Sequence, residues 1–118
     1  MAITVYGIPN CDTVKRARAW LDRNSFAYEF VDFRATPPDR ARVEGWVARF
    51  GAAAMRNTSG GSYRALGAAK DHYQESDWID AYAADSMLIK RPVVEVDGQP
   101  AIVGWTLSED DLVARLRG

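Results

Sequence analysis

Residues 2–33 alternate between strand, helix and strand patterns, and this order restricts the possible folds more than any other feature of the chain. Residues 2–6 alternate apolar and polar side chains, and residues 26–33 are rich in aromatic and β-branched residues, as is typical of strands. Between them, from Cys11 to about Asn24, apolar residues recur at helical spacing. A β-α-β unit requires parallel strands joined by a right-handed crossover. The chain is therefore predicted to begin with a parallel strand pair.

The last thirty residues indicate a hairpin followed by a helix. Asp97-Gly98 is a strong hairpin turn signal between the apolar runs 93–96 and 101–103. Ser108, followed three residues later by Asp111, resembles the capped start of a last helix, which we expect to end near Arg117. Together with the first strands, the hairpin predicts an α/β fold with a mixed four-stranded sheet. This is the thioredoxin plan, and element order alone leaves several other α/β folds open.

The middle of the chain is predicted to be helical. Thr36 is the expected cap of a helix that Gly51 ends, with Pro37 and Pro38 at its start. A polar, glycine-rich loop over residues 57–62 comes next.

Two further helices are expected after this loop. The first is short, over residues 63–66, and the second runs from about Ser76 to Ala84, with Ser76 or Glu75 as its cap. We expect one domain over residues 1–118, in which about 1–34 and 88–118 form the thioredoxin-like part. Residues of about 35–87 would then form an inserted helical subdomain.

Charge and composition exclude several classes of protein. A net charge of −1 offers no general attraction to nucleic acid or to an anionic membrane surface, and no apolar run approaches the ~20 residues that span a bilayer. One cysteine cannot form an internal disulfide, which excludes a disulfide scaffold and favours a reducing compartment. The N-terminus does not resemble a signal peptide. We expect a cytoplasmic protein.

Cys11 is the strongest candidate for chemistry because it lies where the first strand turns into the helix. Unpaired backbone N–H groups and the helix dipole favour an anion there, and the thiolate anion is the form of cysteine that attacks. Lys15 and Arg18 are expected to add positive charge to this end of the helix. The alternative is that Cys11 is a small buried apolar residue.

Other positions are weaker candidates. His72 is the only histidine, so with a single cysteine no metal site is expected, and we interpret it as an exposed loop residue. The loop at 57–62 lacks the lysine pattern of a phosphate-binding loop and is expected to line one edge of the Cys11 cleft. Trp105 is expected to flank the same cleft.

Three segments and one dipeptide resemble a known family. Residues 5–18 read VYGIPNCDTVKRAR, residues 56–67 read RNTSGGSYRALG, and residues 88–94 read LIKRPVV. Together with Gly104-Trp105, in this order, they resemble the ArsC/Spx/YffB family, and most closely its YffB branch. The resemblance spans nearly the whole chain. It implies a thioredoxin-like fold with a helical insertion and a cis peptide bond before Pro92.

The resemblance also implies a chemistry for the site. In arsenate reductases of this family the cysteine attacks arsenate, and glutathione or glutaredoxin then resolves the adduct. Arginines hold the oxyanion, because a planar guanidinium forks onto two oxygens. Arg91 matches the arginine before the proline, whereas Asn57 and Gly104-Trp105 stand where arsenate reductases carry further arginines. This smaller set of arginines disfavours tight arsenate binding.

These arguments give one set of candidate site residues. They comprise Cys11 as the nucleophile, Arg91, Lys15, Asn57, Thr13 and Asn10 as ligands of a substrate or anion, and Pro92 and Gly104 as residues that shape the cleft.

The expected function is that of a glutathione-dependent thiol-disulfide oxidoreductase with one nucleophilic cysteine. Spx-type proteins carry a Cys-x-x-Cys pair, but Val14 occupies the second position here, so Cys11 must use an external thiol such as glutathione. We expect no tightly bound cofactor, with glutathione as a co-substrate or glutaredoxin as a partner. Two alternatives stay open: a glutathione- or glutaredoxin-dependent arsenate reductase, and an Spx-like regulator that binds the RNA polymerase α-subunit.

Overall fold

A computed structural model describes residues 1–117, which form a four-stranded mixed sheet and helices. In chain order, the elements are β1 (Ile3–Gly7), α1 (Asp12–Arg23), β2 (Glu29–Asp32), α2 (Arg40–Phe50), α3 (Gly61–Ala65), the 3-10 helix η1 (Gly67–His72), α4 (Glu75–Ala84), the 3-10 helix η2 (Ser86–Leu88), β3 (Val93–Val96), β4 (Gln99–Val103) and α5 (Glu109–Arg117). The strand order is β2-β1-β3-β4, with β1 parallel to β2 and the other neighbours antiparallel. This confirms the predicted mixed sheet of the thioredoxin-like plan.

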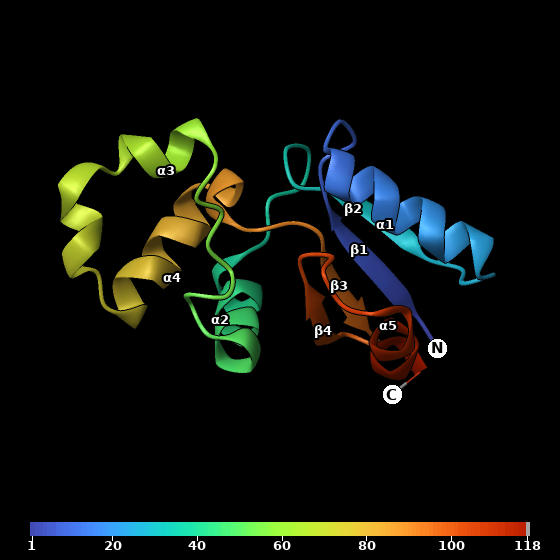
Figure 1. Cartoon of the computed structure of the whole chain (residues 1–118). Helices are drawn as coiled ribbons and strands as arrows, with labels where there is room; N and C mark the ends of the chain where they lie inside the picture. Colours follow the sequence, from blue (N-terminus) through green and yellow to red (C-terminus); the bar gives the residue numbers. More distant parts are fainter. Residues whose placement is uncertain (118) are drawn as a thin grey trace.

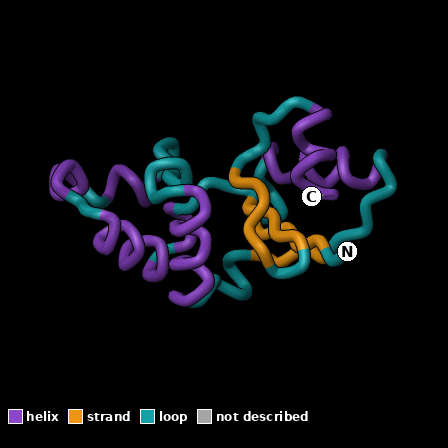
Figure 2. Tube along the Cα trace, turned by 90° about the horizontal axis from the view of Figure 1, so that it is seen from below, coloured by secondary structure: helices purple, strands orange, loops and turns teal. Residues whose placement is uncertain are grey.

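The helices are distributed unevenly around the sheet (Figures 1 and 2). The molecule measures 43 × 26 × 26 Å. The helices α2, α3 and α4, which come between β2 and β3, gather at one end, while α1 and α5 lie beside the sheet at the other end. The chain therefore passes twice between the sheet and the helical end, once before α2 and once after η2.

The two faces of the sheet build two separate cores, because successive side chains of a strand point to opposite faces. On β1, Ile3 and Val5 join the core made with α1 and α5, whereas Tyr6 joins the core made with α2 and α4. Leu21 of α1 and Trp46 of α2 are among the largest fully buried side chains of these two cores. The start of α1, where Cys11 lies, is thus packed on a well-filled core.

The first helix of the insertion begins later than expected. Asp39, and not Thr36, caps α2: its carboxylate accepts a hydrogen bond from the backbone N–H of Arg42 at 2.8 Å. A residue that precedes a proline avoids helical geometry. Thr36 precedes Pro37, which itself precedes a proline, so the helix cannot start until both prolines have passed. The predicted stop at Gly51 is confirmed, since Gly51 ends α2 with a φ of 86°.

Three other boundaries also differ. The cap of α4 is Gln74, which forms a reciprocal capping box with Asp77, and neither Ser76 nor Glu75 caps this helix. The expected strand over residues 26–33 is ordered as a strand only over Glu29–Asp32, and the short helix over 63–66 covers Gly61–Ala65 instead. These shifts leave the order of the elements unchanged.

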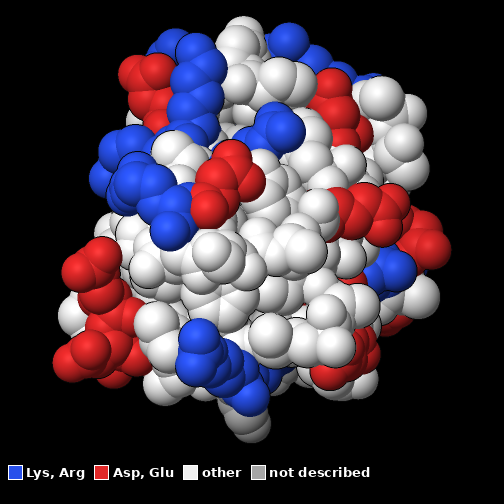
Figure 3. Space-filling view, turned by 90° about the vertical axis from the view of Figure 1, so that its right-hand side faces the viewer, with Lys and Arg blue, Asp and Glu red and all other residues white. Residues whose placement is uncertain are grey.

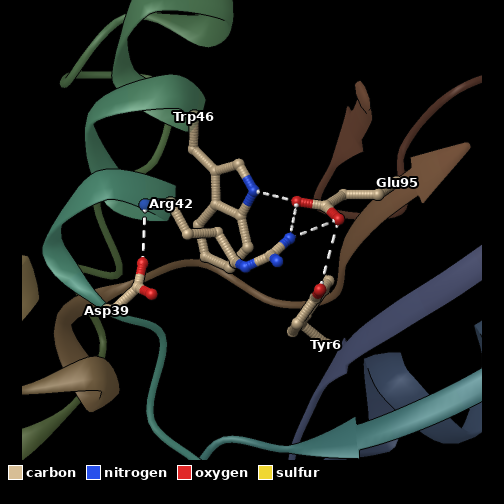
Figure 4. A network of polar contacts seen from close by, with 5 residues as sticks. All are labelled: Tyr6, Asp39, Arg42, Trp46 and Glu95. Atoms are coloured by element: carbon tan, nitrogen blue, oxygen red, sulfur yellow. Dashed lines mark hydrogen bonds and ion pairs between the residues drawn. The ribbon is translucent and has the colours of Figure 1, made fainter. Parts of the chain in front are cut away.

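A buried carboxylate joins the insertion to the sheet (Figure 4). Glu95 on β3 is 3% exposed, and its oxygens accept hydrogen bonds from Nη1 of Arg42 at 2.6 and 2.7 Å. They also accept from Nε1 of Trp46 at 2.8 Å and from the hydroxyl of Tyr6 at 3.2 Å. The hydrogen bond to Glu95 raises the pKa of Arg42. One carboxylate thus fastens α2 to both β1 and β3.

This network predicts a specific loss of stability at alkaline pH. Burial, assisted by the nearby Glu95 carboxylate, raises the pKa of Tyr6 to about 12. Its unfolded pKa is about 10, so Tyr6 contributes stability that is complete below about pH 10 and is lost as the pH rises towards 12. The full shift corresponds to roughly 2–3 kcal/mol. In urea unfolding, wild type is expected to lose more stability than Tyr6→Phe across this window. Equal losses would contradict the assignment.

The face that carries α1 and α5 shows charges of both signs (Figure 3). Lysine, arginine, aspartate and glutamate side chains alternate around an uncharged central area, so the coloured residues on this face form no field of a single sign. Within residues 1–117, every helix is too short or too polar to cross a membrane.

Candidate active site

Cys11 occupies the N-cap position of α1. Its backbone is extended (φ −97°, ψ 125°), and its carbonyl oxygen accepts a hydrogen bond from the backbone N–H of Lys15 at 2.9 Å. The turn before it closes through a hydrogen bond from Cys11 N to the carbonyl of Ile8 at 3.4 Å. The side chain is half-buried and makes no cap hydrogen bond. The thiol thus stands at the positive end of the helix dipole and within reach of a ligand.

Arg91 supplies a guanidinium whose hydrogen bonds are incomplete. Its Nη1 lies 3.4 Å from the carbonyl of Met87 and 3.5 Å from that of Ile89. Its Nε is buried and has no hydrogen-bond partner among residues 1–117. Buried polar groups are nearly always paired, because an unpaired one costs about 1–3 kcal/mol. The peptide bond between Arg91 and Pro92 is cis, as the resemblance implied.

One cleft of about 300 Å³ brings the thiol and this guanidinium together. Its lining residues are Cys11, Thr13, Arg16, Asn57, Ser59, Lys90, Arg91, Gly104, Trp105 and Thr106. Three of them are cationic, and no aspartate or glutamate of the described chain is among them. Larger hollows of about 730 and 690 Å³ lie beside α4 and α2, but neither is lined by a thiol. The chemistry therefore points to the smaller cleft.

The cleft contains some predicted site residues and leaves others outside. Cys11, Thr13, Asn57, Arg91 and Gly104 line it, as does Trp105, whereas Lys15 and Asn10 are exposed and are not part of the lining. Helix geometry explains why Lys15 is outside the lining. Residues three apart share a face of a helix, so Arg16 accompanies Thr13, while Lys15 points elsewhere.

Arg18 also faces away from the thiol. Its Nε donates a hydrogen bond to the hydroxyl of Tyr28 at 3.0 Å, and its guanidinium lies 4.2 Å from the centre of the Phe30 ring. Aromatic contacts of this kind hold a cation in place. Arg18 thus braces α1 against the edge of the sheet.

Asn57 attaches the loop after α2 to the segment before β3. Its Nδ2 donates to the carbonyl of Met87 at 3.1 Å, and its Oδ1 accepts from the hydroxyl of Ser59 at 2.9 Å. Its backbone N–H donates to the carbonyl of Leu88 at 2.9 Å. Asn57 therefore places Ser59 at the edge of the cleft and supports the backbone that leads to Arg91.

Gly104 makes room for a cation that the sequence analysis overlooked. Its φ is 74°, and a Cβ at this position would lie 3.1 Å from Cδ of Lys90. The aliphatic part of Lys90 therefore passes over the glycine. Lys90 and Arg16 were both missed as lining residues. Their proximity to Arg91 and Thr13, one and three positions away, was the available signal.

The second position of the Cys-x-x-Cys motif belongs to the core. Val14 is fully buried, and a Cβ on Gly7 would lie only 2.7 Å from Cγ2 of Val14. Glycine is therefore needed where β1 ends because the valine fills the space beside it.

His72 is the last residue of η1 and is exposed, so it lies in a 3-10 helix where a loop was expected. Across residues 1–117, no three or more histidine, cysteine, aspartate or glutamate side chains are grouped as metal ligands. The reactive and charged side chains that line the cleft are a thiol and three cations.

The motifs of the cleft lie within a stretch that a family model recognises. The model of the ArsC family matches residues 6–111, a stretch that includes Cys11, Arg91 and Gly104. The chain belongs to the ArsC family. This match confirms the resemblance that was drawn from the motifs around these three residues.

Individual ArsC-family relatives agree with the assignment. The solved structure of a YffB protein has a TM-score of 0.86 and 37% identity, and the match covers 97% of this chain and 98% of that one. The uncharacterized protein YusI of Bacillus subtilis is 30% identical over 109 residues, covering 89% of this chain and 92% of YusI. An arsenate reductase of Neisseria meningitidis is 25% identical over 103 residues, covering 85% and 88%. The chain is thus arsenate reductase-like, with a thioredoxin-like fold.

The lining predicts how the thiol of this ArsC-family chain responds to charged reagents. Because Arg16 lines the cleft and Lys15 does not, Arg16→Gln should slow alkylation of Cys11 by anionic iodoacetate by about two- to fivefold. Alkylation by neutral iodoacetamide should change little, and Lys15→Gln should have the smaller effect on the ratio of the two rates. The rates are measured by mass spectrometry at low salt, where screening is weak. An equal loss in both variants would contradict the assigned lining.

Proposed function

We propose that this protein is a glutathione-dependent thiol-disulfide oxidoreductase in which Cys11 is the nucleophile. The supporting observation is that Cys11 and Arg91 line one cleft, where Nε of Arg91 is buried without a partner in the described chain. A guanidinium with unused donors suits a carboxylate, and glutathione carries carboxylates at both ends of a thiol. Membership of the ArsC family, with arsenate reductase relatives, supports thiol chemistry of this kind.

The proposed reaction has two exchanges. The Cys11 thiolate attacks the glutathione sulfur of a mixed disulfide, so that a bond forms between Cys11 and glutathione and the second thiol leaves as a thiolate. The thiolate of another glutathione then attacks the glutathione sulfur of this adduct, which releases oxidised glutathione and regenerates the Cys11 thiolate. The proton of the incoming glutathione passes to the departing thiol. One disulfide is reduced and one is formed, so the electrons balance.

The cleft residues have separate tasks in this scheme. Arg91 binds a carboxylate of glutathione and holds its sulfur near Cys11, since holding reactants in place lowers the entropic part of the barrier. Thr13, which lines the cleft beside Cys11, offers a hydroxyl to the thiolate. Asn57 keeps the loop and the Arg91 segment in position through its hydrogen bonds to Met87 and Ser59.

A turnover assay tests the proposal. The protein is mixed with glutathione and the mixed disulfide of glutathione and cysteine, and the oxidised glutathione formed is followed with glutathione reductase and NADPH. The expected result is turnover well above the uncatalysed rate, with one glutathione on Cys11 by intact mass spectrometry when glutathione is limiting. A rate equal to the uncatalysed one, without an adduct, would reject the proposal.

Arsenate reduction is a second candidate function, favoured by the Neisseria meningitidis relative and by Arg91. Against it, the side chain of Asn57 is neutral and hydrogen-bonded to neighbouring loops, and Trp105 lines the cleft after the hairpin. Arsenate should therefore give Cys11 little protection from iodoacetamide at millimolar concentration. Strong protection would favour arsenate as the substrate.

A further inference from the structure

Two cations at the cleft have no partner of opposite charge. Arg16 on α1 and Lys90, just before Arg91, line the cleft from two different segments, and both are exposed. Neither forms an ion pair or a side-chain hydrogen bond with any residue of the described chain. The salt bridges found in residues 1–117 are the following: Arg40 with Asp80, and Arg42 with Glu95. Like charges on one cleft raise the local concentration of anions.

The path of Lys90 is determined by the fold. Its backbone N–H donates to the carbonyl of Met55 at 2.7 Å, and its stem passes over Gly104, where any Cβ would come within 3.1 Å. Trp105, the next residue, also lines the cleft and is packed edge-on against Trp20, with 5.8 Å between the ring centres. A lysine stem laid on such a surface keeps its ammonium in water. Lys90 is therefore an exposed cation of the cleft lining.

The cations of the cleft fall into two groups. Arg91 has a buried Nε and so forms the inner group, whereas Arg16 and Lys90 form an exposed pair. Glutathione has a matching division, since a carboxylate lies on each side of its thiol. Its glycine end carries a carboxylate alone, while its γ-glutamyl end also carries an ammonium group, which a pair of cations would repel.

We infer that Arg16 and Lys90 form a subsite for the glycine carboxylate of glutathione, so that the cleft selects thiols with a second anionic group. This inference rests on the proposed function, because it names the substrate contacts of the same site. Arg16 and Lys90 are specificity residues here, and neither takes part in the exchange of sulfur bonds.

The test measures binding without turnover. S-methylglutathione cannot form a disulfide, and in its glycine monoethyl ester the carboxylate in question is replaced by a neutral ethyl ester. Both are titrated by calorimetry into wild type, into Arg16→Gln/Lys90→Gln and into Arg23→Gln/Arg34→Gln. The last variant removes two exposed positive charges from residues outside the cleft lining.

Wild type and the charge-matched control, Arg23→Gln/Arg34→Gln, should bind S-methylglutathione (the acid) about five- to tenfold more tightly than its glycine monoethyl ester (the ester). This ratio is expected for two exposed ion pairs. Arg16→Gln/Lys90→Gln should bind the two compounds equally, and Arg16→Lys/Lys90→Arg should restore part of the preference. Equal affinities in wild type, a preference that survives in the double variant, or no binding of either compound would each overturn the inference.

The turnover assay separates this inference from the proposed function. Glutathione-dependent turnover together with equal affinity for acid and ester would reject the subsite alone. A clear preference for the acid without turnover would reject the oxidoreductase and leave the anion subsite standing.

Discussion

Cys11→Ser is expected to lower glutathione-dependent turnover to the uncatalysed rate, a loss of about a thousandfold or more. A serine hydroxyl is not ionised near neutral pH and cannot replace a thiolate in disulfide exchange. The chain has no other cysteine that could take over. The measurement is the turnover assay with glutathione and the glutathione–cysteine disulfide.

The fold should tolerate this change, so the loss would report on chemistry. Cys11 is half-buried and its side chain makes no cap hydrogen bond, while serine is a favoured N-cap residue of nearly the same size. Unfolding in urea should shift by less than about 1 kcal/mol. Arg91→Lys is the matched variant. It keeps the positive charge but loses the planar guanidinium that binds a carboxylate through two parallel hydrogen bonds, and it should retain turnover at a reduced level. Full turnover by Cys11→Ser would exclude Cys11 as the nucleophile.

Glu95→Ala is expected to lower the free energy of unfolding by about 3–5 kcal/mol, a large effect for a single polar residue. The substitution removes the acceptor of four hydrogen bonds. The indole N–H of Trp46 is buried and would be left unpaired, as would the hydroxyl of Tyr6. Arg42 is partly exposed and can turn to water, so its own share of the loss is smaller.

Two comparisons make this measurement specific. Glu95→Gln keeps the shape but lacks the charge, and its amide places N–H groups against donors, so it should cost less than Glu95→Ala but remain destabilising. Arg42→Met, alone and combined with Glu95→Ala, closes a double-mutant cycle whose coupling energy measures the pair itself. A loss below about 1 kcal/mol in Glu95→Ala would show that the network adds little to stability.

Local patterns were sufficient to predict most of the fold. The strand before Cys11, the helix after it and the hairpin at Asp97-Gly98 follow from periodicity and turn chemistry, and all three are present in the structure. The start of α2 depends on several consecutive residues and not on one cap residue alone. Thr36 has the right chemistry for a cap, but two consecutive prolines keep the backbone extended until Asp39.

The cap of α4 shows a second limit. Serine and acidic residues are common at helix starts, which favours Ser76 or Glu75, yet Gln74 caps the helix through its reciprocal bonds with Asp77. Glutamine is not among the residues most favoured at that position. The geometry of the pair, rather than the type of either residue, determines where α4 begins.

Contacts between residues far apart in the chain could not be predicted from local sequence patterns. Glu95 reads as one polar residue in an apolar strand, and nothing local shows that Arg42, 53 positions away, will lie against it. The lining of the cleft could not be predicted locally either. Lys90 lies against Gly104, which follows the hairpin and is 14 positions later in the chain. Cys11 and Arg91 could be predicted as residues of one cleft because each sits in a short motif.

The contact between Gly7 and Val14 means that neither position can be changed without regard to the other. A side chain at position 7 would collide with Cγ2 of Val14, so Gly7→Ala should be harmful while the valine is present. Val14→Cys would place a second sulfur one helical turn after Cys11, and would relieve the crowding only with that sulfur in the direction of Cγ1, 3.5 Å from a Cβ at position 7. Positions 7 and 14 are therefore coupled, because a side chain at position 7 needs the space that Cγ2 of Val14 fills.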